Sequence, residues 1–326
     1  MDAAAPESSA PPDSAPPAGP SSTGAPRPPV AGFFAALLVL QVVAGGAAQR
    51  ADQVLGLAWS ELAAFLLPAA MVAAGSNLLP ARFLLLTRRP TAAQVRLGAL
   101  AGLAGFAAAS GLVGLWTRLL PPAWIRAFDL LSRFQGTPLQ QAGLVAVAAG
   151  LAPVCEEIAF RGYLQSALRL RLGDGTAIAV GAVLFAAMHL NPVNLPGLLL
   201  LGALFGWLAL RTGSVWPGVA AHAANNAVAS LIALAVPDTA GRAEPADLLP
   251  ALALAAVGLA ALPALRVAVI RAAPTVPAPL DAVGAIDPSR AAGRFRPSAL
   301  SRSFLFATAA AWLALAALLA WRAPGH

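Results

Sequence analysis

Nine apolar segments, each about as long as a membrane-crossing helix, constrain the fold of this chain more than any other feature. About 20 apolar residues in α-helical conformation cross the hydrocarbon layer of a bilayer. The segments are residues 30–49, 56–79, 97–117, 142–160, 176–192, 194–210, 214–236, 248–270 and 302–321. Strands are not expected, because an open sheet edge leaves backbone groups unpaired in lipid. We therefore predict an all-α, polytopic transmembrane helix bundle.

The number of spans is eight or nine. Segments 176–192 and 194–210 are cramped, since only the short sequence NPVNLPG joins them. The fourth segment, 142–160, is expected to continue as helix to about residue 172.

The composition supports the bilayer as solvent. The chain of 326 residues is 59% hydrophobic and 11% charged, with a mean hydropathy of +0.74, whereas a soluble domain carries about 25% charge. The net charge is +7, and every basic residue is an arginine. These arginines are scattered at the ends of apolar segments, so a nucleic-acid partner is not expected. The single cysteine, Cys155, excludes an internal disulfide framework.

Four regions follow from this pattern. Residues 1–29 are rich in Pro, Ala and Ser and are expected to be a disordered tail. Residues 30–141 would hold the N-terminal helices, and residues 142–236 the helices that carry the polar motifs. Residues 237–326 would hold the last helices, with a cytoplasmic linker at about 271–301.

The arginines also predict the orientation. If nine helices start from a cytoplasmic N-terminus, 15 of the 21 arginines lie on the inner side, as the positive-inside rule requires. An alanine-rich chain without lysine is typical of a bacterium with GC-rich DNA. We therefore expect an integral protein of a bacterial inner membrane with its N-terminus in the cytoplasm.

Two adjacent acids stand out in CEEIAFRGYL, residues 155–164. Glu157 and Arg161 have i, i+4 spacing and should form an ion pair on one helix face. Glu156 points about 100° away and has no cation at helical spacing. A carboxylate in that position is suited to act as a general base, although both acids could equally belong to one structural ion-pair cluster. Glu61, after Ser60, is interpreted as a capping acid at the start of the second span.

His189 is expected at the same depth in the membrane as Glu156. The helices 142–172 and 176–192 form a hairpin about LGDGT. At a rise of about 1.5 Å per residue, Glu156 and His189 lie about 25 and 22 Å from this turn. Alone, a histidine in a span is more often a packed, hydrogen-bonded residue, but the matching depth favours a shared site.

His222 and Asn226 form a second polar pair, again with i, i+4 spacing on one helix face. Their donors suit an anionic oxygen, and an interhelical hydrogen bond is as good an interpretation. A zinc ion, or another divalent metal, held by Glu156, His189 and His222 is possible in residue type, but no spacing requires it. Cys155 is interpreted as a small core residue.

Together these segments resemble the CPBP family of intramembrane proteases. The family pattern is E-E-x-x-x-R, F-x-x-x-H and H-x-x-x-N. It is matched by Glu156 to Arg161, by Phe185 to His189 and by His222 to Asn226. The family includes type II CAAX prenyl endopeptidases and bacteriocin-processing and immunity proteins. The resemblance covers about residues 142–236.

The resemblance implies hydrolysis of peptide bonds in membrane-associated proteins or peptides. Glu156 would activate water that His189 positions, His222 and Asn226 would stabilise the oxyanion, and Glu157 with Arg161 would give structural support. Both metal-dependent and metal-free mechanisms are argued for the family. Two other classes stay open, namely a proton- or ion-coupled transporter and a catalytically silent scaffold or immunity protein. A transporter is expected to show two related halves, which this sequence lacks.

Overall fold

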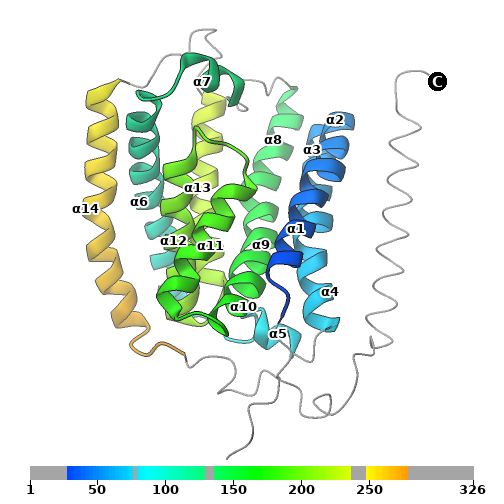
Figure 1. Cartoon of the computed structure of the whole chain (residues 1–326). Coiled ribbons are helices and arrows are strands. Elements are labelled where there is room, and N and C mark those ends of the chain that lie inside the picture. Colours follow the sequence, from blue (N-terminus) through cyan, green and yellow to red (C-terminus); the bar gives the residue numbers. More distant parts are fainter. Residues whose placement is uncertain (1–27, 76–78, 129–135, 236–246, 278–326) are drawn as a thin grey trace, which may run out of the picture.

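The fold is a bundle of long helices that lie side by side (Figure 1). The structure, a computed structural model, describes residues 28–75, 79–128, 136–235 and 247–277. Within these ranges it contains helices and no strand. The predicted all-α, polytopic helix bundle is confirmed.

The N-terminal part comprises three long helical units and two short helices. The first unit is α1 (Ala31–Val39), η1 (Leu40–Gly45) and α2 (Gly46–Ala51), and the second is α3 (Gln53–Ser60), η2 (Glu61–Leu66) and α4 (Leu67–Gly75). They are followed by α5 (Pro80–Phe83), α6 (Ala92–Thr117) and α7 (Pro122–Phe128). The segments η1 and η2 are π-helical turns within otherwise continuous helices.

The C-terminal part comprises five long helical units. The first is α8 (Pro138–Ala146), η3 (Val147–Leu151), α9 (Ala152–Glu157), η4 (Ile158–Gln165) and α10 (Ser166–Arg169). The others are α11 (Asp174–Met188), α12 (Leu195–Thr212), α13 (Trp216–Ala235) and α14 (Leu248–Ala272).

The expected spans are found wherever the structure describes them. Seven helices are long and apolar enough to cross a membrane, and α11, with 15 residues, is a shorter apolar helix. The segment 302–321 lies outside the described residues, as do nearly all of the N-terminal tail and most of the linker expected at 271–301. The second span differs in its start. It begins at Gln53, with the Asp52 carboxylate accepting a hydrogen bond from the Leu55 N–H as its N-cap.

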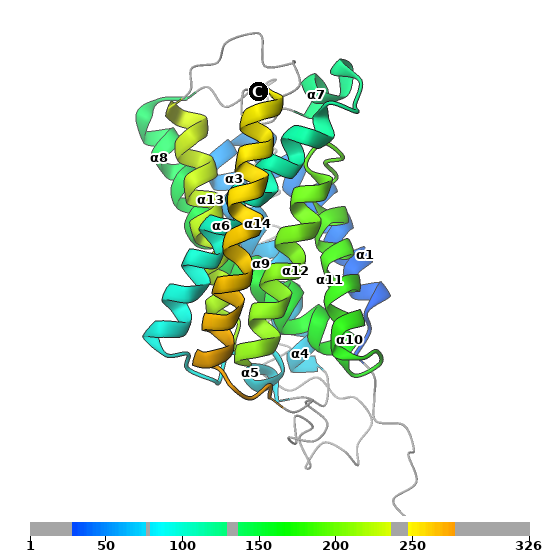
Figure 2. The ribbon, with the colours of Figure 1, turned by 90° about the vertical axis from the view of Figure 1, so that its left-hand side faces the viewer.

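Small residues let α6 approach α13 and α14 closely, as Figure 2 shows for these neighbouring helices. A side chain at Gly102 would overlap the carbonyl oxygen of Ala221, and one at Gly111 would overlap the backbone of α14 at Ala255. Contacts of this kind are typical of helices in lipid, where packing rather than burial from water drives association. Helix α13, which carries His222, is therefore held firmly against α6.

The unit from Pro138 to Arg169 is continuous but irregular. Pro153 has no backbone N–H, so it cannot complete the α-helical ladder at that point. A π-helical segment, η3, ends two residues before it, and η4 begins at Ile158. Such π-helical turns are frequent at functional sites. Here they flank the short α-helical stretch that carries Glu156 and Glu157.

Candidate functional site

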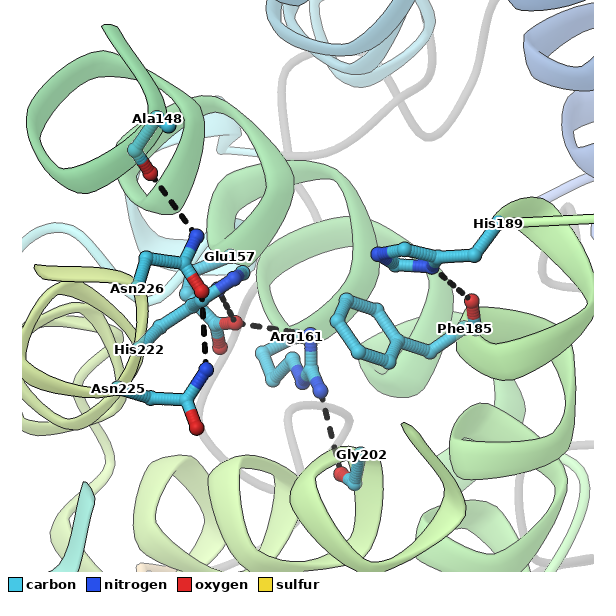
Figure 3. Close-up of polar contacts among 9 residues, drawn as sticks. All are labelled: Ala148, Glu157, Arg161, Phe185, His189, Gly202, His222, Asn225 and Asn226. Carbon is cyan, nitrogen blue, oxygen red and sulfur yellow. Dashed lines mark hydrogen bonds and ion pairs between the residues drawn. The ribbon is translucent and has the colours of Figure 1, made fainter. Parts of the chain in front are cut away.

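Glu157 is fully buried, and one of its oxygens contacts both Arg161 and His222. Arg161 Nη1 lies 2.8 Å from Glu157 Oε1, and His222 Nδ1 lies 3.1 Å from the same atom (Figure 3). Arg161 Nη2 donates to the carbonyl oxygen of Gly202 on α12, at 3.2 Å. The ion pair expected between Glu157 and Arg161 is present. Through Gly202 and His222 it links the helical unit Pro138–Arg169 to α12 and α13.

Aromatic rings surround this ion pair. The Arg161 guanidinium lies 4.3 Å from the centroid of the Phe185 ring and 5.3 Å from that of Phe205. Phe205 stacks on the His222 imidazole, with the ring centroids 4.9 Å apart. The charges are therefore removed from solvent and compensated by each other, which is the arrangement in which a buried ion pair is tolerated.

Glu156 faces a different environment from its neighbour. Its side chain is 9% exposed and lines a cavity of about 290 Å³ that His189 also lines. The oxygen Oε2 of Glu156 is buried and has no hydrogen-bond partner among the described residues. The two residues expected at equal depth on the hairpin thus share one cavity.

His189 is held at the C-terminal end of α11. Its Nδ1 lies 2.9 Å from the carbonyl oxygen of Phe185. A carbonyl only accepts hydrogen bonds, so Nδ1 carries the proton and Nε2 of the neutral ring is an acceptor. Figure 3 shows Nε2 on the side of the ring away from that carbonyl. Leu190 follows with φ of 48°, a left-handed conformation that is costly for a residue with a side chain.

The loop after His189 is fixed from two sides. The Asn191 side chain accepts hydrogen bonds from the backbone N–H groups of Val193 and Asn194, at 3.0 and 3.2 Å. Trp116, at the end of α6, donates its indole N–H to the carbonyl oxygen of Pro192, at 2.9 Å. These contacts compensate for the strained backbone at Leu190 and keep the imidazole at the cavity.

His222 and Asn226 lie on the Glu157 side of the site. Asn226 Nδ2 donates to the carbonyl oxygen of Ala148 at 2.9 Å, and Asn225 Nδ2 donates to Asn226 Oδ1 at 3.0 Å. Neither His222 nor Asn226 is among the described residues that line the cavity of Glu156 and His189. The Phe185 ring connects the two sides, with its centroid 4.7 Å from that of His189 and 5.8 Å from that of His222.

The proposed metal ligands do not come together as a set. Among the described residues no group of three or more His, Cys, Asp or Glu side chains is close enough to hold a metal ion. Glu156 and His189 line one cavity, whereas His222 does not line it and is hydrogen-bonded to Glu157. The residues as arranged here do not fit a zinc site or another divalent metal site. Cys155 is buried in the hydrophobic core, as expected of a packed cysteine.

The structure places a further acid, Glu61, at this cavity, although its sequence position was interpreted as that of a helix cap. Glu61 is 3% exposed and lines the same cavity as Glu156, and its Oε2 has no hydrogen-bond partner among the described residues. The interpretation of Glu61 as a helix cap is wrong, because Asp52 caps this helix and Glu61 lies eight residues beyond Gln53. An Asp-Gln pair ahead of the apolar run was the signal that the helix begins earlier.

Fold and site together define an integral membrane protein with paired ionisable groups enclosed in an all-α bundle. Residues 138–228 match the family model described as type II CAAX prenyl endopeptidase Rce1-like. The matched region contains all three motifs, so the resemblance to this family of intramembrane proteases is confirmed. It supports a membrane protease of the CAAX type in general. No curated protein and no solved structure matches the chain.

Proposed function

We propose that the protein is an intramembrane endopeptidase that hydrolyses peptide bonds of membrane-associated proteins or peptides. The observation that carries this proposal is the cavity shared by Glu156 and His189, which are 33 positions apart in the sequence and on different helices. A water molecule between them can give its proton to the Glu156 carboxylate. The Nε2 acceptor of His189 orients this water, so that its oxygen attacks the substrate carbonyl.

His222 and Asn226 are proposed to stabilise the oxyanion that this attack creates. Asn226 has a second amide N–H besides the one given to Ala148. His222 Nδ1 faces the Glu157 carboxylate, which accepts hydrogen bonds only, so Nδ1 carries a proton. Nε2 becomes a second donor when the ring is also protonated there. Glu157 and Arg161 support this role by holding the imidazole. Donors fixed before the reaction are effective because they need no reorganisation when charge develops.

The distribution of arginines supports a cytoplasmic N-terminus in a bacterial inner membrane. In the described part of the chain, most arginines lie near the end of the bundle where α6 starts and α14 ends, which is the lower end in Figure 1. Those at this end are Arg82, Arg88, Arg89, Arg96, Arg169, Arg171, Arg211, Arg266 and Arg271. Those at the opposite end are Arg50, Arg118 and Arg126. An arginine-rich end is typical of the cytoplasmic side.

The test is a Glu156→Gln variant, purified in detergent and assayed on membrane-inserted peptides that the wild-type protein cleaves. Loss of a general base lowers the rate by about 10² to 10⁴-fold. Glutamine has the same shape, so the thermal unfolding temperature should be unchanged. Asp52→Asn is the matched control, because it removes a carboxylate outside the cavity and asparagine also caps helices well. Wild-type rates in Glu156→Gln would end the proposal.

A further inference from the structure

The cavity that Glu156 and His189 line is also lined by polar side chains from the first two spans. Gln41 and Gln49 come from the first helical unit, and Glu61 comes from the second. Three buried oxygens around it have no hydrogen-bond partner among the described residues, namely Gln41 Oε1, Glu61 Oε2 and Glu156 Oε2. Buried polar atoms are almost always paired, so these three atoms indicate a proton, water or substrate group that they share.

The charges around the cavity restrict what that group is. The ionisable side chains that line it are Glu61, Glu156 and His189, and the buried thiol of Cys155 lies close enough to both carboxyls to interact with them. No arginine is among the described residues that line it, and the Arg161 guanidinium is bound to Glu157. Two carboxylates without a cation repel each other in an apolar bundle. Sharing one proton removes the repulsion and supplies a donor for an unpartnered oxygen.

We propose that Glu61 is a further catalytic residue, which donates a proton to the leaving amine while Glu156 acts as the base. This inference rests on the proposed endopeptidase function. Amide hydrolysis needs both roles, because an amine leaves poorly unless its nitrogen is protonated. We assign the base role to Glu156 because it and His189, which orients the water, are carried by the two helices of one hairpin. Glu61 supplies the second carboxyl from a helix outside the matched region 138–228.

The proton balance closes over one cycle. Water attacks the carbonyl carbon, and its proton passes to Glu156. The C–N bond of the tetrahedral intermediate then breaks, while the Glu61 carboxylic acid gives its proton to the nitrogen. The products are a carboxylic acid and an amine, formed from the peptide and one water molecule. Glu156 now holds the proton and Glu61 is ionised, so transfer of one proton within the pair restores the starting state.

The test compares two leaving groups in the same protein. A peptide that the wild type cleaves is prepared with its amide bond and, separately, with a p-nitrophenyl ester at the same position. Nitrophenolate leaves without being protonated, so only the amide depends on the acid. We expect Glu61→Gln to lower amide cleavage about 10² to 10⁴-fold and ester cleavage less than about tenfold. Glu156→Gln should lower both, and Asp52→Asn neither.

The outcomes separate this inference from the proposed function. Equal loss of amide and ester cleavage in Glu61→Gln, or no loss of either, overturns the acid role even when Glu156→Gln is inactive. Wild-type rates in Glu156→Gln overturn the proposed function itself. An infrared measurement gives a readout that does not depend on activity. The difference between wild type and Glu61→Gln at neutral pH should contain the C=O band of a protonated carboxyl, and its absence overturns the shared proton.

Discussion

The carboxylates of Glu156 and Glu157 lie on different faces of one helix and have different partners. Glu157 is bound by Arg161 and His222 at a single oxygen, whereas Glu156 Oε2 has no partner among the described residues and faces a cavity. One acid therefore serves the structure, and the other is free for chemistry. Substitutions of the two should separate stability from activity.

Removing the cation of the buried pair should destabilise the protein. In Arg161→Met the Glu157 carboxylate loses its shortest contact, and breaking one side of a buried pair costs about 3–5 kcal/mol. We expect a clear fall in the thermal unfolding temperature in detergent, with partial recovery in the double variant Glu157→Gln/Arg161→Met. Arg169→Met is the control, because its partner Asp174 keeps 42% of its side chain exposed and solvent weakens an ion pair that it reaches. Equal effects of the two single variants would contradict this.

The close approach of α6 and α13 should be sensitive to a single methyl group. Gly102→Ala inserts a Cβ against the carbonyl oxygen of Ala221, next to His222 in the chain. Overpacking of this kind costs about 1–3 kcal/mol, and the shift should also lower activity. Gly150→Ala is the matched control, since no atom lies within 4 Å of its added Cβ. Thermal unfolding of both variants checks this prediction, and equal unfolding temperatures would argue against tight packing at Gly102.

Phe185 should matter for activity beyond its contribution to packing. Its ring contacts both imidazoles and the Arg161 guanidinium. Phe185→Leu and Phe83→Leu both alter buried rings and should each lower the free energy of unfolding by about 1 kcal/mol. Only Phe185→Leu should also lower the cleavage rate, by about tenfold or more, since small misplacements of catalytic groups are costly. Similar rates in the two variants would show that Phe185 only fills space.

The orientation can be checked by labelling single cysteines. The one native cysteine, Cys155, is buried, so an introduced thiol gives the signal. Gly175→Cys lies at the start of α11, at the arginine-rich end, and Leu119→Cys is 76% exposed at the other end. In intact cells a membrane-impermeant maleimide should label Leu119→Cys, and it should label Gly175→Cys only after lysis. The reverse pattern would invert the assigned topology.

Much of this architecture follows from patterns that local physics controls. Apolar segments of helical length predicted the seven described helices of membrane-spanning length and the shorter α11, and i, i+4 spacing predicted the contact of Glu157 with Arg161. Equal distances from the LGDGT turn predicted that Glu156 and His189 share a level, and they line one cavity. In each case the controlling distances lie within one helix or one hairpin.

Contacts between distant helices were not predictable in this way. Nothing in the spacing of His222 indicates that its ring bonds to Glu157, 65 residues earlier. Glu61 was misread as a cap because its helix begins at Gln53, eight residues earlier, and its cavity depends on how the first two spans pack on α9. The π-helical turns were not predicted either, since each is a short segment within an otherwise continuous helix.

The short length of α11 has a consequence for the surrounding lipid. Fifteen residues rise only about 22 Å, against a hydrocarbon layer about 30 Å thick. The end of α11 that carries His189 must therefore sit below the headgroups, unless the bilayer becomes thinner beside it. Thinning of this kind costs fractions of a kcal/mol per Å and would bring water within reach of the recessed imidazole. The acyl-chain length of the host membrane thus becomes a determinant of how readily the reaction centre is hydrated.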